Sequence, residues 1–178
     1  MSRTVIHGGL VITASDEIHA DVLVEGGRVV ALAAHGTDAA EGWSADRRID
    51  ATGKYVIPGG VDAHTHMEMP LGGTYAADTF ATGTRAAAWG GTTTIVDFAI
   101  QSMGGGLCQG LDAWYAKADG KCAVDYAFHM ILADVNPSTL KEMDLLVAEG
   151  ITSFKGFVRS RDQGFSSGVG GVSCGVAV

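Results

Sequence analysis

The first 55 residues alternate short apolar segments with glycine-containing turns. The apolar segments predict strands at residues 4–7, 10–13, 21–25 and 28–33. Gly8-Gly9 and Gly26-Gly27 separate two pairs of these strands at hairpin spacing, where glycine adopts positive φ at little cost. Residues 35–47 are polar and alanine-rich, which predicts a loop. Because the strands are few and too short to close a sandwich, we expect residues 1–55 to form a small β-rich module that needs strands from elsewhere.

From residue 55 onwards the pattern changes to longer apolar runs rich in Val, Ile and Phe. Runs at residues 55–63, 92–100, 124–132 and 152–157 predict strands that are buried on both faces, as in parallel sheets. Helix-like segments lie between them at residues 78–89, 111–118 and 137–149. Strand, helix and strand repeating about every thirty residues predict βαβ units. The predicted fold class is α/β, as the first half of a (β/α)8 barrel or as a small open sheet.

Capping residues mark the ends of the predicted helices. Asp78 is the candidate N-cap of the first helix, and Asn136 or Ser138 is the candidate for the last. The last helix carries an apolar stripe that we expect to be buried, made of Leu140, Met143, Leu146 and Val147.

The stretch PGGVDAHTHMEM at residues 58–69 is the main candidate for chemistry. Alternate side chains of a strand share a face, so Asp62, His64 and His66 are expected to point the same way. Two imidazoles at the end of a buried strand suit the start of a metal site. From this triplet alone, ordinary buried or surface histidines remain the commoner explanation.

Composition and charge exclude several function classes. The chain is 47% hydrophobic and 18% charged, which is typical of a globular protein. Its net charge of −8, with scattered Lys and Arg, lacks the basic surface of a nucleic-acid binder and the cationic helix of a membrane-surface protein. Neither a secretory signal nor an apolar run of transmembrane length is evident. Gly104-Gly105-Gly106 follows the second apolar strand, but GxGxxG and GK[ST] are lacking, which disfavours nucleotide binding.

The cysteines point to a reducing compartment. Cys108, Cys122 and Cys174 are an odd number without a tight motif, which argues against a disulfide framework. Neither Cys108 nor Cys122 has a His or Asp context that suggests a nucleophile. We therefore expect a cytoplasmic protein.

Five motifs together resemble one family of enzymes. The motifs, in chain order, are VIPGGVDAHTHMEMP, GGTYAADTF, GGTTTIVDFAIQ, DYAFHMIL and EGITSFK. In order and spacing they are similar to cyclic-amide hydrolases of the amidohydrolase superfamily, above all the dihydropyrimidinase and D-hydantoinase group. Dihydroorotases usually carry an arginine just after HxH, where this chain has Met67 and Glu68. The resemblance runs from residue 1 to about residue 157.

The resemblance implies a TIM barrel with a binuclear zinc centre, flanked by a small β-sandwich built from both chain termini. It implies small cyclic amides, namely dihydropyrimidines and 5-substituted hydantoins, as substrates, and a homotetramer as the common assembly. His64 and His66 match the histidines that bind the more buried zinc ion. Lys155 matches the lysine that is N-carboxylated and bridges both zinc ions.

Lys155 has two possible roles, as a carboxylated metal ligand or as a structural cation. A lysine inside an apolar strand is desolvated, which favours the neutral amine that can add carbon dioxide. Alternatively, Lys155 extends to the strand end as a structural cation. With the other motifs present, we favour the metal ligand. The family resemblance further assigns Met69, Leu71 and Phe157 to the pocket for the exocyclic group of the substrate.

Three further polar residues are weaker candidates. Asp62 shares the face of the histidines, and we expect it to support the ligands or cap the strand. Asp97 interrupts an apolar strand, and we expect it to form structural hydrogen bonds, because a buried carboxylate needs partners. His129 is expected to be a buried or supporting histidine rather than a ligand.

The resemblance ends after Phe157. Residues 158–178 form a tail rich in Gly, Ser and Val, with Ser160 where the family has its oxyanion-binding tyrosine. We hypothesise a shifted reading frame or a foreign end, which resequencing the gene around Phe157 tests. The expected organisation is thus 1–55 (part of the sandwich), 56–157 (first βα units) and 158–178 (non-matching tail).

The later histidines and the catalytic aspartate of the family are not found, so no catalytic set is complete, and we expect the chain alone to be inactive. Two other interpretations stay open. The first is a non-catalytic dihydropyrimidinase-like scaffold, which the retained His64, His66 and Lys155 disfavour. The second is another cyclic amidase such as an allantoinase.

Overall fold

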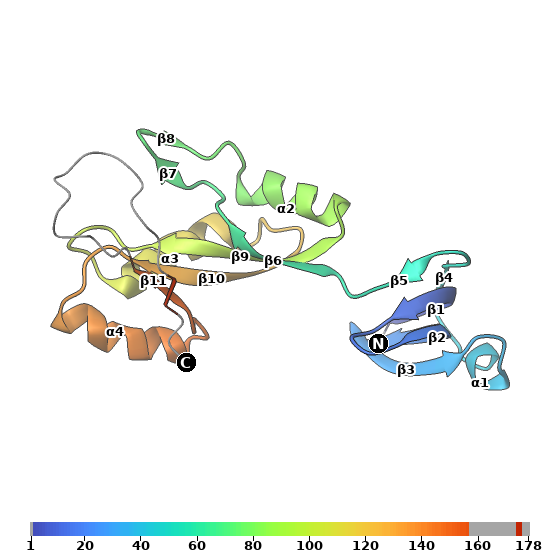
Figure 1. Ribbon diagram of the computed structural model, residues 1–178. Helices are drawn as coiled ribbons and strands as arrows, with labels where there is room; N and C mark the ends of the chain where they lie inside the picture. Colours follow the sequence, from blue (N-terminus) through green and yellow to red (C-terminus); the bar gives the residue numbers. More distant parts are fainter. Residues whose placement is uncertain (1, 157–173, 176–178) are drawn as a thin grey trace. The chain divides into compact units, whose positions relative to one another are not determined.

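The computed structural model describes residues 2–156 and 174–175. These residues belong to two compact units that divide between Pro58 and Gly59 (Figure 1). The division falls inside the predicted strand 55–63. Its first part pairs within the N-terminal sheet and its second part within the C-terminal sheet. Proline lacks the backbone N–H that a continuous strand would use, which accounts for a break at Pro58.

The first unit is a mixed sheet in the order β3-β2-β1-β4, with β5 also on β1; β4 and β5 are parallel to β1, and the other pairs are antiparallel. Its elements are β1 (Arg3–Ile12), β2 (Glu17–Glu25), β3 (Arg28–Ala34), α1 (Asp38–Glu41), β4 (Arg47–Asp50) and β5 (Tyr55–Val56). The expected hairpin at Gly26-Gly27 is present, and both glycines have positive φ. The expected hairpin at Gly8-Gly9 is wrong: β1 continues through it with a register shift between Ile6 and Gly9. The glycine pair therefore permits a β-bulge, with Gly8 at φ 74°.

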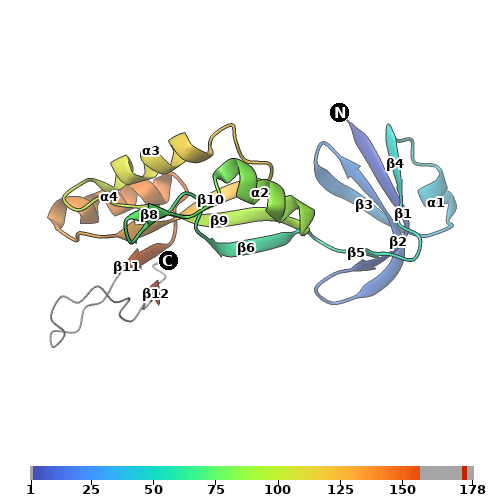
Figure 2. The same cartoon turned by 90° about the horizontal axis from the view of Figure 1, so that it is seen from above.

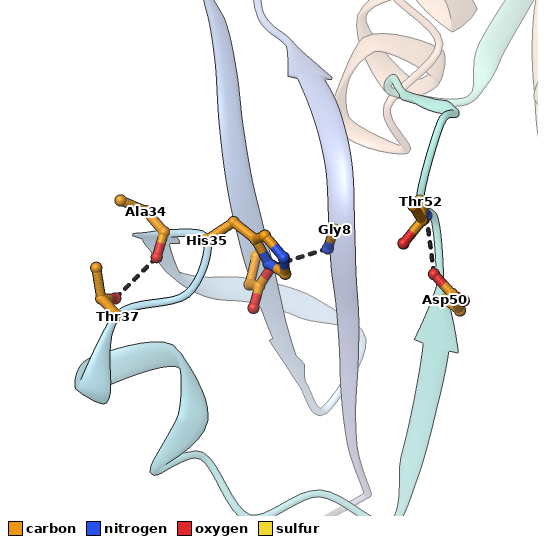
Figure 3. A network of polar contacts seen from close by, with 7 residues as sticks. Gly8, Ala34, His35, Thr37, Asp50 and Thr52 are labelled. Carbon is orange, nitrogen blue, oxygen red and sulfur yellow. Dashed lines mark hydrogen bonds and ion pairs between the residues drawn. The ribbon is translucent and has the colours of Figure 1, made fainter.

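A polar cluster contacts the middle of β1 at Gly8 (Figure 3). The buried carboxylate of Asp21 accepts a hydrogen bond from Gly8 N at 2.9 Å and contacts His35 Nδ1 at 2.7 Å. Burial by itself raises the pKa of Asp21, but the hydrogen bonds from Gly8 and His35 outweigh it and hold that pKa below its ordinary value.

The second unit is built on a parallel sheet in the order β11-β10-β9-β6, extended at one edge by β12, which is antiparallel to β11. Its elements are β6 (Gly60–Thr65), β7 (Pro70–Leu71), β8 (Thr74–Tyr75), α2 (Phe80–Trp89), β9 (Thr92–Ile100), α3 (Leu107–Ala118), β10 (Asp125–Leu132), α4 (Pro137–Ala148), β11 (Phe154–Gly156) and β12 (Cys174–Gly175). The fold is therefore a mixed α/β one with a partial barrel. β12 lies in the segment where the sequence predicted no element.

Helices α2, α3 and α4 lie along one side of these strands (Figure 2). Their core combines Phe80 of α2, Trp114 of α3 and Leu146 of α4 with the strand residues Ile95, Ala99, Phe128, Met130 and Phe154. Burial of both faces is wrong for β6, an edge strand of the described sheet in which five of the six residues are exposed. Val61 is accordingly 66% exposed.

The helix predictions were right in position and less accurate at the ends. α2 begins after Thr79, which forms a capping box with Thr82, rather than after Asp78. α4 is capped by Asn136, as expected. Of its predicted stripe only Leu146 is fully buried, whereas Leu140 is 52% exposed. Among the described residues α3 is the helix that packs against α4, so a single face of α4 is covered.

Candidate metal centre

The candidate site lies on the sheet face opposite the helices. Side chains alternate along a strand, and Ile95, Ala99, Phe128, Met130 and Phe154 belong to the helix-side core. The residues between them therefore point to the other face, which we call the inner face. It carries His64 and His66 at the end of β6, Phe98 of β9, His129 of β10 and Lys155 of β11.

The two histidines of the HxH motif converge through the same ring atom. His64 Nε2 and His66 Nε2 are 3.2 Å apart, and the rings are nearly perpendicular at 88°. In a tetrahedral zinc site with Zn–N bonds of about 2.0–2.1 Å, two ligand nitrogens are about 3.3 Å apart. The observed distance therefore fits two ligands of one zinc ion. It also fits a hydrogen bond between one protonated and one bare imidazole nitrogen.

The environment of His66 favours the neutral form of its imidazole. Desolvation lowers the pKa of His66 below its ordinary value, and the positive charges of His64 and Lys155 lower it further against the opposing effect of Asp97. A neutral imidazole is the form that binds a metal. Within the described part of the chain, His66 Nδ1 is buried without a hydrogen-bond partner.

The backbone around His66 is held from β9. Asp97 is fully buried, and its Oδ2 accepts hydrogen bonds from Thr65 Oγ1 at 2.9 Å and from Met67 N at 2.7 Å. Thr65 and Met67 flank His66, so this carboxylate fixes the segment on both sides of the ligand candidate. Asp97 thus forms the structural hydrogen bonds expected from the sequence.

Lys155 and Phe98 complete the inner face. Lys155 is only 7% exposed, and its Nζ lies 4.4 Å from the centroid of the Phe98 ring. The same ring lies 4.6 Å from the His64 centroid and 5.0 Å from that of His66. Phe98 therefore brings all three ligand candidates to one aromatic surface. Sequence reasoning missed this residue, although its place next to Asp97 at a strand end could have indicated it.

The described residues alone do not form a complete metal-binding set. Within residues 2–156 and 174–175, no three His, Cys, Asp or Glu side chains are placed to hold one metal ion. The site as described consists of two histidines, with Lys155 on the same face.

Residues 55–165 match the model of the Amidohydrolase family. This chain belongs to the amidohydrolase family. As an amidohydrolase it is 78% identical over 157 residues to a D-hydantoinase of Streptomyces coelicolor, a match that covers 88% of this chain and 34% of the relative. It is 40% identical over 161 residues to a dihydropyrimidinase of Rattus norvegicus, covering 90% of this chain and 31% of the relative.

Solved structures of hydantoinases have the same fold as this amidohydrolase. A D-hydantoinase of Bacillus sp. AR9 aligns with a TM-score of 0.78 and 49% identity, covering 89% of this chain and 33% of that one. A dihydropyrimidinase of Brevibacillus agri aligns with a TM-score of 0.79 and 47% identity, covering 85% and 32%. The resemblance to the dihydropyrimidinase and D-hydantoinase group is confirmed, and the lineage is one of hydrolases. The chain spans about a third of the length of these relatives.

The remaining predicted residues have different outcomes. Leu71 lies in β7 and is 67% exposed, and Met69 just before it is partly buried. Phe157, Ser160 and most of the tail lie outside the described residues. Asp62 accepts a hydrogen bond from the backbone of His64, which is a supporting contact. No helix in the described part of the chain is long and apolar enough to cross a membrane.

Proposed function

We propose that this chain provides the first part of a binuclear zinc centre that hydrolyses the cyclic amide bond of dihydropyrimidines and 5-substituted hydantoins. The observation that carries the proposal is the convergence of His64 Nε2 and His66 Nε2 at 3.2 Å. It occurs in a chain that is 78% identical to a D-hydantoinase over the matched segment. Retention of both histidines and of Lys155 favours an enzyme over a non-catalytic scaffold.

The residues of the inner face would have distinct roles. His64 and His66 would hold one zinc ion through their Nε2 atoms. Lys155, once N-carboxylated, would present two carbamate oxygens and bridge to the second zinc ion. When bound, the zinc ions supply a hydroxide nucleophile at neutral pH and polarise the ring carbonyl. The position of Lys155 supports this role, because its Nζ lies 4.4 Å from the centroid of the Phe98 ring that also contacts both histidines.

The substrate's exocyclic group would contact the segment after the HxH motif. Met69 and Leu71 lead into the β7–β8 hairpin, whose turn residues Gly72 and Gly73 both have positive φ. Leu71 is exposed and therefore available to an apolar substituent. Phe157, expected in the same pocket, stays a prediction, as does assembly into a homotetramer.

A chimeric protein tests the function. Residues 1–156 of this chain would replace the matched segment of the Streptomyces coelicolor D-hydantoinase, which supplies the remaining two thirds. We expect two zinc ions per chain, a mass increase of one carbon dioxide on Lys155, and hydrolysis of hydantoin or dihydrouracil. His64→Asn, His66→Asn and Lys155→Ala should each abolish hydrolysis and lower the zinc content.

His19→Gln is the matched control, because His19 is an exposed histidine of the other unit. It should leave zinc content and rate unchanged. Full activity in the His64→Asn and His66→Asn chimeras would refute the proposal. The 178-residue chain purified alone should show no hydrolysis of either substrate, and measurable turnover by it would contradict the assignment of only part of the site to this chain.

A further inference from the structure

We propose that His129 is a positioning residue that ties the strand carrying His64 and His66 to the strand carrying Lys155. The inference rests on the proposed function, since it concerns how these ligands are held. His129 is itself placed between the two ligand-bearing segments and not among the ligands.

The imidazole of His129 bonds to both segments at once. Its Nε2 lies 2.9 Å from the carbonyl oxygen of Ala63, the residue directly before His64. Its Nδ1 is hydrogen-bonded to the hydroxyl of Ser153, two residues before Lys155. One ring thereby connects the end of β6 to the start of β11.

This connection crosses a strand. In the sheet order β11-β10-β9-β6, the strand β9 separates β10, which carries His129, from β6. The imidazole passes over β9 at Phe98, with ring centroids 4.7 Å apart and ring planes tilted by 38°. Backbone pairing cannot make such a link, because ladder hydrogen bonds join only adjacent strands.

The Ala63 carbonyl lies where the regular ladder is interrupted. The register between β6 and β9 shifts between Asp62 and Thr65, so Ala63 and His64 lie in an irregular segment. A bulge redirects side chains and weakens local pairing. The hydrogen bond from His129 therefore fixes the part of β6 from which His64 projects.

The partners also determine the tautomer of His129. A carbonyl oxygen can only accept, so Nε2 carries a proton, and in the neutral imidazole the bare Nδ1 then accepts from the Ser153 hydroxyl. Both ring nitrogens are occupied by protein groups. His129 is therefore not available as a metal ligand in this arrangement, and its effect on a metal would act through His64 and Lys155.

Substitutions can remove the two bonds separately. His129→Gln places an amide N–H near the Nε2 position and keeps the bond to Ala63, whereas His129→Asn places an oxygen near Nδ1 and keeps the bond to Ser153. His129→Phe keeps the ring over Phe98 and removes both. Supporting hydrogen bonds of metal ligands are typically worth about 10–100-fold in metal affinity.

The experiment measures zinc affinity of the purified 178-residue chain by competition with a chromogenic chelator. We expect binding to weaken about tenfold in His129→Phe, and less in the Gln and Asn variants. Ser153→Ala should weaken zinc binding as much as His129→Gln, because both remove the bond between His129 Nδ1 and the Ser153 hydroxyl. For the same reason, the double variant Ser153→Ala with His129→Gln should bind zinc no more weakly than either single variant. In the zinc-free chain, ¹⁵N NMR should find His129 protonated at Nε2.

Leu146→Ala separates positioning from general destabilisation. Leu146 is 1% exposed in the helix-side core, away from the inner face. Its truncation therefore destabilises the fold and leaves the contacts of the inner face in place. It should leave zinc affinity per folded molecule unchanged, and an equal loss in Leu146→Ala and His129→Phe would overturn the proposal. Unchanged affinity in His129→Phe, or an Nδ1-protonated ring, would overturn it as well.

The outcomes also distinguish this inference from the proposed function. If zinc binding requires His64 and His66 but is indifferent to His129, only the positioning role fails. If zinc binding is indifferent to His64 and His66, the proposed function fails. The link between the strands can then still be tested by the tautomer of His129. It can also be tested by comparing the unfolding free energies of Ser153→Ala, His129→Gln and the double variant.

Discussion

Asp97→Asn should loosen the segment that carries His66. The carboxylate accepts three hydrogen bonds, two at Oδ2 from Thr65 Oγ1 and Met67 N, and one at Oδ1 from Phe98 N at 2.7 Å. Asparagine has one acceptor oxygen and one donor amide. If its oxygen stays with Thr65 and Met67, its amide N–H₂ faces the N–H of Phe98, and that bond is lost.

The magnitude follows from these bonds. Losing one hydrogen bond to a charged group costs about 1.5–3 kcal/mol, and the two remaining bonds weaken because their acceptor becomes neutral. Relief from burying an ionised carboxylate offsets part of the loss. We expect a net local cost of about 2 kcal/mol, which corresponds to about a 30-fold change in an opening equilibrium. Asp97→Ala removes every acceptor and should cost more, at about 4 kcal/mol.

Amide hydrogen exchange measures this effect locally. The N–H groups of Met67 and Phe98 are donated to Asp97, so both should exchange about 30-fold faster in Asp97→Asn. Asp112→Asn, an exposed aspartate of α3, is the matched control and should leave both rates unchanged. Equal protection of Met67 and Phe98 in Asp97→Asn and in the unsubstituted chain would refute the reasoning.

Three further predictions concern stability, each followed by urea unfolding of the full chain. Gln101→Leu should lower the free energy of unfolding by about 2–3 kcal/mol, because the buried amide oxygen of Gln101 accepts hydrogen bonds from two backbone N–H groups of the loop after β10. A smaller loss would contradict that role. Gly110→Ala should destabilise the fold more than Gly83→Ala. At Gly110 the added Cβ would lie 2.8 Å from a backbone carbonyl of β9, which cannot easily move, whereas at Gly83 it would lie 2.3 Å from the movable end of a methionine side chain. The reverse order would show that the strand moves more easily than the methionine. The lowered pKa of Asp21 contributes stability at pH values above the ordinary aspartate pKa, and this contribution is lost as the pH falls through the lowered pKa. The urea midpoint should therefore drop as the pH falls below about 5, and the drop should be smaller in Asp21→Asn, which keeps His35.

Elements whose ends depend on nearby residues could be predicted from the sequence. β9 has the predicted bounds 92–100, and α4 begins behind its predicted cap Asn136. α3 begins four residues before the predicted start at 111. The N–H of Cys108 in its first turn is donated to Glu142 of α4 at 2.9 Å, so a contact 34 residues away supports this helix end. No local pattern contains that information.

The site divides in the same way. His64 and His66 could be found because their spacing and strand-end position are local features. The links between strands could not, because they depend on the sheet order and on the register shift in β6. Ser153 and the Ala63 carbonyl become important only once β10 is known to lie two strands from β6.

Adjacent residues of β9 hold the candidate site from opposite faces of the sheet. Asp97 points to the helix side, where it fixes the backbone on both sides of His66, and Phe98 points to the inner face, where its ring contacts His64, His66 and His129. The alternation of a strand therefore separates backbone support from side-chain support within one dipeptide. All of these contacts lie within residues 59–156. The arrangement of the two histidines and the lysine is thus determined inside the second unit, which explains how a chain spanning about a third of its relatives can still bring these three residues together.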